Sequence, residues 1–318
     1  MKRAIPAAIA AVVACSVSID AQWPKYQEPG VPRDAQGRVL MDAAPPRTSD
    51  GRPDLSGLWR RADRDPPIPE LRGITTARDS GGQQPPAAGG RGAQPAPAGG
   101  VVVEPPVQPF PPDPKSPPVA AFWDLAFNIP GGLPFTPWAA DLKKQRMATD
   151  DKDNPDANCM PMGITQFHMQ PQPRKIIQTP KLILIIYEAN YGLRHIYLDG
   201  RKLPPQGEPQ PWWYGYSVGR WEGDTLVVET NNLRGAEEGP YDGWLDVRGS
   251  PYSAQAKFTE RFRRPTFGKL EIDVTLEDPK AYTKPFTVRI NQRAMPDEEL
   301  IEFICNENQQ FRRRVKID

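Results

Sequence analysis

Glu260 is the first candidate for acid–base chemistry in this sequence. It lies in an alternating segment, on the same face of a predicted strand as Phe258 and Phe262. If that face points inward, the Glu260 carboxyl is buried among aromatic rings, which raises its pKa and suits a general acid or base. The alternative is that Glu260 pairs with an arginine inside the fold, which we favour because buried ion networks also perturb pKa values without catalysis. The candidate partners are Arg194, Arg289 and Arg293.

Glu188 and His195 are the second candidate pair. They lie in consecutive predicted strands that a tight turn joins. An acid beside a histidine sets its tautomer for proton transfer, whereas the simpler interpretation is an ordinary cross-strand contact. If either the pair or Glu260 is catalytic, the chain is an enzyme of the hydrolase, lyase or isomerase kind.

The aromatic residues form the third candidate site. Trp212, Trp213, Tyr214, Tyr216 and Trp221 lie within ten residues of one another, and Tyr241, Trp244 and Tyr252 follow. Exposed rings stack on sugar faces or on aromatic ligands. The structural alternative is an apolar lid over one end of the fold, and the sequence leaves both interpretations open.

Metal and nucleotide chemistry have little support in the sequence. There is no P-loop, GxSxG, HExxH or paired CxxC motif, and the two histidines exclude a multi-histidine metal site. Cys159, Met160, Met162, His168 and Met169 are soft ligands that suit copper(I), but their spacing matches no defined site. We favour an irregular loop with Cys159 in a disulfide, and we expect no metal and no cofactor.

The elements that must position these residues are strands. Leu270, Ile272, Val274 and Leu276 alternate with polar residues, which predicts a sheet with one wet face, and residues 181–187 are apolar on both faces, which predicts a covered strand. A first strand is expected at 54–61. The further strands are expected at 174–179, 181–189, 193–199, 214–221, 225–231, 256–264, 269–276, 285–292 and 299–305. Strands in sequence order predict a mainly β protein whose antiparallel meander closes into a barrel.

The N-terminal third has a different organisation. Residues 1–21 have a basic start and a short apolar run, which are typical of a signal peptide. Two cleavage sites are possible: one lies near Ala21, and the other is a lipobox that would make Cys15 a lipid anchor. Residues 22–53 form a Pro-rich extension that should lie on the surface. Residues 79–118 are rich in Gly, Pro and Ala, which predicts a disordered linker. A helix should start after the linker, with Thr136 as N-cap and Pro137 at its first position, followed by the barrel within residues 119–318.

Charge and cysteine content indicate the compartment and the partners. Forty Lys and Arg residues balance thirty-nine Asp and Glu residues, so nucleic acid is not an expected partner. If Cys15 belongs to the signal or anchor, Cys159 and Cys305 remain as a disulfide candidate in an oxidising compartment, unless they are two separate buried thiols. We therefore predict an exported protein, either periplasmic, secreted or attached to the outer membrane through Cys15.

Four segments resemble an uncharacterised family of exported bacterial proteins. They are RPDLSGLW (52–59), SVGRWEGDTLVVET (217–230), FTERFRR (258–264) and EDPKAYTKPFT (277–287). The resemblance covers most of residues 45–318 outside the linker, and it supplies no activity. A second similarity, in architecture, is to lipocalin-like barrels: Gly57-x-Trp59 stands on a strand ahead of a β-meander. That resemblance implies a central cavity for a small, mostly apolar molecule.

Two functional hypotheses result. The first is a module that binds a small apolar or glycosidic molecule in the barrel cavity, with the rings at Trp212, Trp213, Tyr214, Tyr216, Trp221 and Trp244 as ligand contacts. The second is an envelope enzyme that uses Glu260 or the Glu188–His195 pair. A purely structural envelope protein would have no cavity at all.

Overall fold

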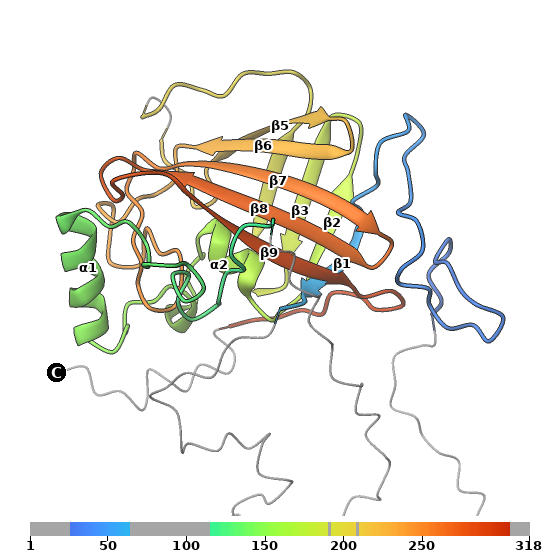
Figure 1. Ribbon diagram of the computed structural model, residues 1–318, viewed down its shortest axis with the longest axis horizontal. Helices are drawn as coiled ribbons and strands as arrows, with labels where there is room; N and C mark the ends of the chain where they lie inside the picture. The colour runs from blue at the N-terminus through green and yellow to red at the C-terminus, as the bar shows by residue number, and fades with distance from the viewer. Residues whose placement is uncertain (1–25, 64–114, 190–191, 208–209, 306–318) are drawn as a thin grey trace, which may run out of the picture.

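The computed structural model describes residues 26–63, 115–189, 192–207 and 210–305 of this chain, and its central feature is a closed β-barrel (Figure 1). Nine strands follow one another around the barrel in sequence order, and the ninth pairs with the first to close it. The strands are β1 (Gly57–Arg61), β2 (Arg174–Gln178), β3 (Leu182–Tyr187), β4 (Leu193–Tyr197), β5 (Tyr216–Glu222), β6 (Thr225–Asn231), β7 (Lys257–Thr266), β8 (Lys269–Glu277) and β9 (Phe286–Ala294). The predicted mainly β barrel is confirmed.

One strand pair departs from the predicted meander. Neighbouring strands run antiparallel except β4 and β5, which are parallel and share only two paired positions, Ile196 with Ser217 and Tyr197 with Val218. A tight hairpin joins only antiparallel strands, so the chain needs a long connection between these two. The barrel wall is consequently weakest at this seam.

Apolar and aromatic side chains point into the barrel and are buried. The exposed fraction is 0–1% for each of eight of them: Ile185, Ile196, Val228, Phe258, Phe262, Ile272, Val274 and Ile290. A barrel of about eight strands has an interior just wide enough for side chains to fill or to hold one small ligand. The central cavity implied by the lipocalin-like resemblance stays a prediction; large apolar and aromatic side chains, Phe258 and Phe262 among them, line the interior in which it would lie.

Each end of the barrel is covered by a different part of the chain. At one end, all six residues of the short helix α2 (Ile164–Met169) are buried, and Phe167 stacks on Tyr187 with 4.1 Å between ring centroids. At the other end, Trp59 is fully buried and the Arg264 guanidinium lies 4.7 Å from the centre of its ring. These contacts extend the packed core beyond the strands.

The Pro-rich N-terminal extension lies on the surface as expected. It crosses the β7–β8 turn, where Gly268 N donates to Met41 O at 2.8 Å, and the β5–β6 turn, where Arg47 pairs with Asp224 at 2.7 Å. These long-range contacts hold residues far apart in the sequence against the end of the barrel nearest Trp59.

The predicted helix after the linker is also confirmed. Helix α1 (Pro137–Ala148) has Pro137 at its first position, and the Thr136 side chain accepts a hydrogen bond from Ala139 N at 3.4 Å. Figure 1 places α1 beyond one end of the barrel, beside the loops that connect the strands there. The helices in the described residues are not long and apolar enough to cross a membrane.

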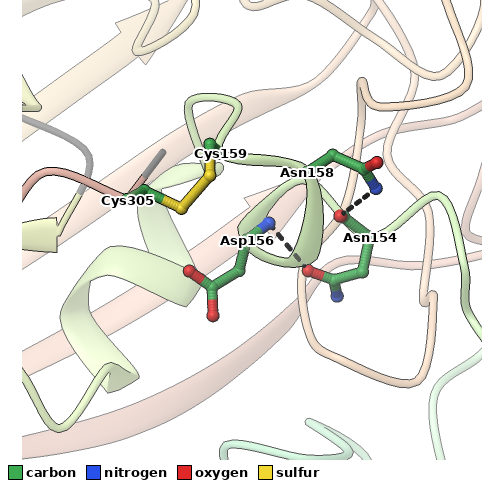
Figure 2. Close-up of a disulfide and its surroundings, with 5 residues drawn as sticks. All are labelled: Asn154, Asp156, Asn158, Cys159 and Cys305. Carbon is green, nitrogen blue, oxygen red and sulfur yellow. Dashed lines mark hydrogen bonds between the residues drawn. A yellow bond between two sulfur atoms is a disulfide. The ribbon is translucent and has the colours of Figure 1, made fainter. Parts of the chain in front are cut away.

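The predicted strand at 299–305 is wrong. The structure gives these residues no regular structure, because β9 already pairs with β1 and leaves no free edge for another strand. Cys305 instead forms a disulfide with Cys159, just after a 3-10 helix at Asp156–Asn158, with 5.6 Å between the two Cα atoms (Figure 2). The expected cysteine pair is confirmed, and it fastens this C-terminal segment to the loop before α2.

Several predictions fall outside the described residues. The signal peptide and Cys15 lie there, as do residues 79–114 of the predicted linker. The last four residues of that linker are described, and Pro118 O accepts a hydrogen bond from Arg289 N of β9 at 2.8 Å.

Candidate functional site

A pocket of about 220 Å³ opens at the seam between β4 and β5. Its wall contains Leu193, His195, Tyr197, Trp212, Trp213, Tyr214 and Tyr216, and its floor contains Arg194 and Ser217. We call this site the aromatic pocket. It lies beside the only two positions at which these parallel strands pair in the described residues, Ile196 with Ser217 and Tyr197 with Val218.

Gly215 makes the turn that brings the aromatic residues to β5. Its φ is +65°, in the left-handed region that L side chains rarely adopt. A Cβ atom at this position would lie 2.6 Å from Thr230 Cγ2 and 2.7 Å from Asn231 O. The sharp bend between Tyr214 and Tyr216 therefore depends on glycine.

Four rings follow one another along the outer side of the pocket. Ring centroids are 5.4 Å apart for Trp212 and Tyr216, 5.3 Å for Tyr216 and Tyr197, and 6.2 Å for Tyr197 and His195. Trp212 is 42% exposed. Because flat, accessible rings stack on the faces of other rings, this arrangement suits a planar or ring-shaped ligand.

The structure brings four of the six predicted ligand residues to this pocket. Trp212, Trp213, Tyr214 and Tyr216 line it, whereas Trp221 and Trp244 lie elsewhere. Trp221 lines a separate depression beside Leu198. Trp244 is buried, with the Arg146 guanidinium 4.1 Å from the centre of its ring, so it serves packing.

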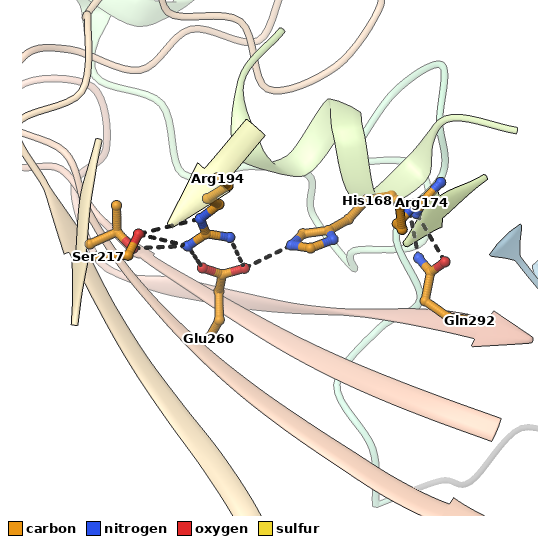
Figure 3. A network of polar contacts seen from close by, with 7 residues as sticks. His168, Arg174, Arg194, Ser217, Glu260 and Gln292 are labelled. Carbon is orange, nitrogen blue, oxygen red and sulfur yellow. Dashed lines mark hydrogen bonds and ion pairs between the residues drawn. The ribbon is translucent and has the colours of Figure 1, made fainter. Parts of the chain in front are cut away.

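A buried polar network lies behind the pocket floor (Figure 3). Arg194 donates to Glu260 through both terminal nitrogens, one of them at 3.0 Å from Oε1, and the Nε2 atom of His168 lies 2.8 Å from the same oxygen. Arg194 also donates to Thr230 Oγ1 at 3.0 Å and to Ser217 Oγ. The alternative that pairs Glu260 with Arg194 is confirmed.

This pairing sets the ionisation of Glu260. Burial alone would raise the pKa of its carboxyl, but the Arg194 charge and the His168 hydrogen bond outweigh burial and lower the pKa to about 2. The expected raised pKa is therefore wrong. An ionised carboxylate held by two partners lacks the proton that a general acid must give.

His168 is neutral in this network. Burial lowers its pKa below the usual value, and the charges of Arg194 and Arg174 lower it further against the opposing effect of Glu260. Since the Glu260 carboxylate can only accept, we assign the His168 proton to Nε2, which leaves Nδ1 as an acceptor; Nδ1 has no hydrogen-bond partner among the described residues. The network thus consists of one ion pair and one neutral donor.

The structure does not bring Glu188 and His195 together. In the β3–β4 ladder His195 lies opposite Leu184, while Glu188 lies beyond the end of β3 and accepts a hydrogen bond from Ile301 N at 3.4 Å. The His195 ring lies outside the barrel, beside Tyr197. A proton relay between these two residues has no geometric basis here.

Three members of the network are not predicted from the sequence. His168 is expected there only as a soft metal ligand, and Ser217 and Thr230 carry no functional prediction. A signal for the two hydroxyls is present, because both occupy inward positions of β5 and β6, where apolar residues are the norm. His168 comes from α2 and has no such signal.

The copper interpretation has no support in the described residues. They contain no group of three or more His, Cys, Asp or Glu side chains placed to hold a metal ion. Cys159 is in the disulfide and His168 contacts Glu260.

Comparisons with known proteins add no family assignment. A scan of protein-family models, a search of curated proteins and a search of solved structures each find no match to this chain. The resemblance to exported bacterial proteins stays a prediction.

Proposed function

We propose that this chain is an exported binding protein whose aromatic pocket takes a small apolar or glycosidic molecule. The observation that carries the proposal is the gathering of Trp212, Trp213, Tyr214 and Tyr216 around one pocket at the β4–β5 seam. The pocket is smaller than the range of about 300–1,000 Å³ typical of drug-sized ligands. A single ring is therefore the part of a ligand that suits it.

The enzyme hypothesis is weaker on the same geometry. Glu260 is ionised and fully engaged, and Glu188 and His195 are apart. The two hydroxyls nearest the floor, Ser217 and Thr230, bond each other at 2.8 Å and accept from Arg194. We therefore favour binding over catalysis.

Export is part of the proposal. The Cys159–Cys305 disulfide supports an oxidising compartment, because such bonds persist mainly outside the cytoplasm. The N-terminal residues suit either release into the periplasm or medium or attachment to the outer membrane through Cys15.

Calorimetric titration with methyl β-glucoside and phenyl β-glucoside tests the pocket. We expect saturable binding to the wild type and a loss of at least tenfold in affinity for Trp212→Ala, since a stacking ring supplies much of the contact. Trp138→Ala on α1 is the matched control and should bind as the wild type does. Equal binding by the wild type and Trp212→Ala would refute the assignment.

A further inference from the structure

The outer faces of the barrel differ sharply in chemistry. On β7 the outward residues include Lys257, Arg261 and Arg263, as expected for a wet face. On β3 the outward residues are Leu182, Leu184 and Ile186, which are only half-buried. The expectation that this strand is covered on both faces is thus met only on the inner face within the described residues.

The aliphatic face of β3 is continuous with the aromatic pocket. Strand register aligns His195 of the pocket with Leu184, and Leu184 with Ile177 of β2. A parallel row aligns Leu193 of the pocket with Ile186. Ile177 is 38% exposed and Leu193 is 45% exposed, so the rows form an accessible apolar track that begins at the pocket.

The track has a definite length. Neighbouring strands are separated by about 4.8 Å, so the row from His195 through Leu184 to Ile177 spans roughly 10 Å. An exposed apolar patch rimmed by polar residues typically marks a binding surface. A track that leaves a ring-sized pocket and then stops suits a chain of limited length attached to a ring.

The charges around the pocket are compensated. Arg194 at the floor is paired with Glu260, and Arg201, whose guanidinium lies 3.7 Å from the Tyr197 ring centre, is paired with Asp199 at 2.6 Å. An anionic head group would therefore find no unpaired cation in either of these residues. The hydroxyl groups of a neutral sugar ring suit the polar edges of Tyr197, Tyr216 and His195 better than an anionic head group does.

We infer that the ligand is amphipathic, with a neutral sugar ring in the aromatic pocket and an unbranched aliphatic chain lying along Leu184 and Ile177. The inference rests on the proposed function and extends it, because it names both parts of the ligand and the surface each part contacts. The same chemistry is found in a free alkyl glycoside and in a glycolipid within a membrane.

An alkyl glucoside series tests the inference. Methyl, butyl, hexyl and octyl β-glucosides are titrated into the wild type by calorimetry below their micelle concentrations. We expect affinity to rise roughly twofold per methylene up to the length of the track, since full burial of a methylene gives about fourfold and an open face buries only one side of the chain.

Two variants separate the track from the pocket. The double variant Leu184→Thr, Ile177→Thr replaces both aliphatic side chains with threonine, a β-branched residue that strands tolerate. We expect the affinity of this variant to be independent of alkyl chain length, while methyl glucoside binds to it as to the wild type. Ile301→Thr is the control, because Ile301 is an exposed aliphatic residue outside the two rows. It should keep the full dependence.

The outcomes are distinguishable. Equal affinity of the wild type for methyl and octyl glucoside overturns the inference and leaves the proposed function standing, whereas no binding of any glucoside overturns both the inference and the glycosidic form of the proposed function. Flotation with phosphatidylcholine vesicles, with and without an added glycolipid, tests whether the ligand is a glycolipid within a membrane. Binding to sugar-free vesicles that is lost in the double variant would make the track a general lipid-docking face and overturn the sugar assignment.

Discussion

The carboxylate of Glu260 and the guanidinium of Arg194 form an ion pair that is completely enclosed by the barrel. They come from β7 and β4, which are not neighbours in the sheet, so the pair crosses the barrel interior. Ser217, Thr230 and His168 make further hydrogen bonds to it. This pair connects the floor of the aromatic pocket to the core.

Removing one partner of this pair should destabilise the fold strongly. Glu260→Gln leaves the Arg194 charge buried without compensation, and we expect a loss of about 3–5 kcal/mol in the free energy of unfolding. Urea denaturation followed by circular dichroism measures it. Glu229→Gln, which breaks an exposed pair with Arg220, is the control and should cost under about 1 kcal/mol. Similar losses for both variants would contradict the interpretation.

Acid should destabilise the protein in two steps. The folded pKa of Glu260 is about 2, below its ordinary value of 4.5, so its stabilisation is present above about pH 4.5 and disappears as the pH falls toward 2. The folded pKa of His168 is also lowered, so the unfolded chain takes up a proton first and stability already begins to fall below about pH 6.5.

Unfolding curves measured between pH 7.5 and pH 3 test this order. His168→Gln keeps a hydrogen-bond donor for Glu260 but does not titrate, so it should flatten the decline between about pH 6.5 and pH 5 and leave the steeper decline at lower pH. A decline that is identical in wild type and His168→Gln throughout would show that other groups control the acid response.

The disulfide should contribute substantially to stability. Cys159 and Cys305 are separated by 146 residues, for which the chain-entropy model gives at most about 5 kcal/mol. In a Cys15→Ser background, Cys305→Ser should lower the urea midpoint, and adding reductant should lower the parent midpoint to the same value. Reductant should leave the Cys305→Ser variant unchanged. A parent protein indifferent to reductant would show that the bond contributes little.

Gly215 should tolerate no side chain. Gly215→Ala places a Cβ atom 2.6 Å from Thr230 Cγ2 in addition to the left-handed φ of +65°, so we expect a loss of more than about 2 kcal/mol together with weaker glucoside binding. Gly223→Ala is a matched control, because Gly223 has a φ of +60° and a Cβ atom there would have no neighbour within 4 Å. It should cost about 1–2 kcal/mol and leave binding unchanged. Equal effects would mean that crowding at Gly215 is unimportant.

Local patterns were sufficient for most of the fold. The alternation in residues 269–276 and the capping residues Thr136 and Pro137 act over a few neighbouring positions, so they predicted β8 and the start of α1 directly. The alternation in residues 256–264 put Glu260 on the same face as Phe258 and Phe262, and the structure shows that this face is buried. The strand predicted at 299–305 failed because its composition suits a strand while the closed barrel offers it no partner.

The sequence by itself determined nine of the ten expected strand segments, the helix start, a candidate pair of cysteines and the concentration of rings near β5. Only the tertiary structure decided that β4 and β5 run parallel, that His168 enters the barrel from α2, and that four of the six predicted ligand rings border the β4–β5 seam. The physical reason is range: periodicity and capping depend on adjacent residues, whereas barrel closure and interior packing depend on residues far apart in the chain that compete for one volume.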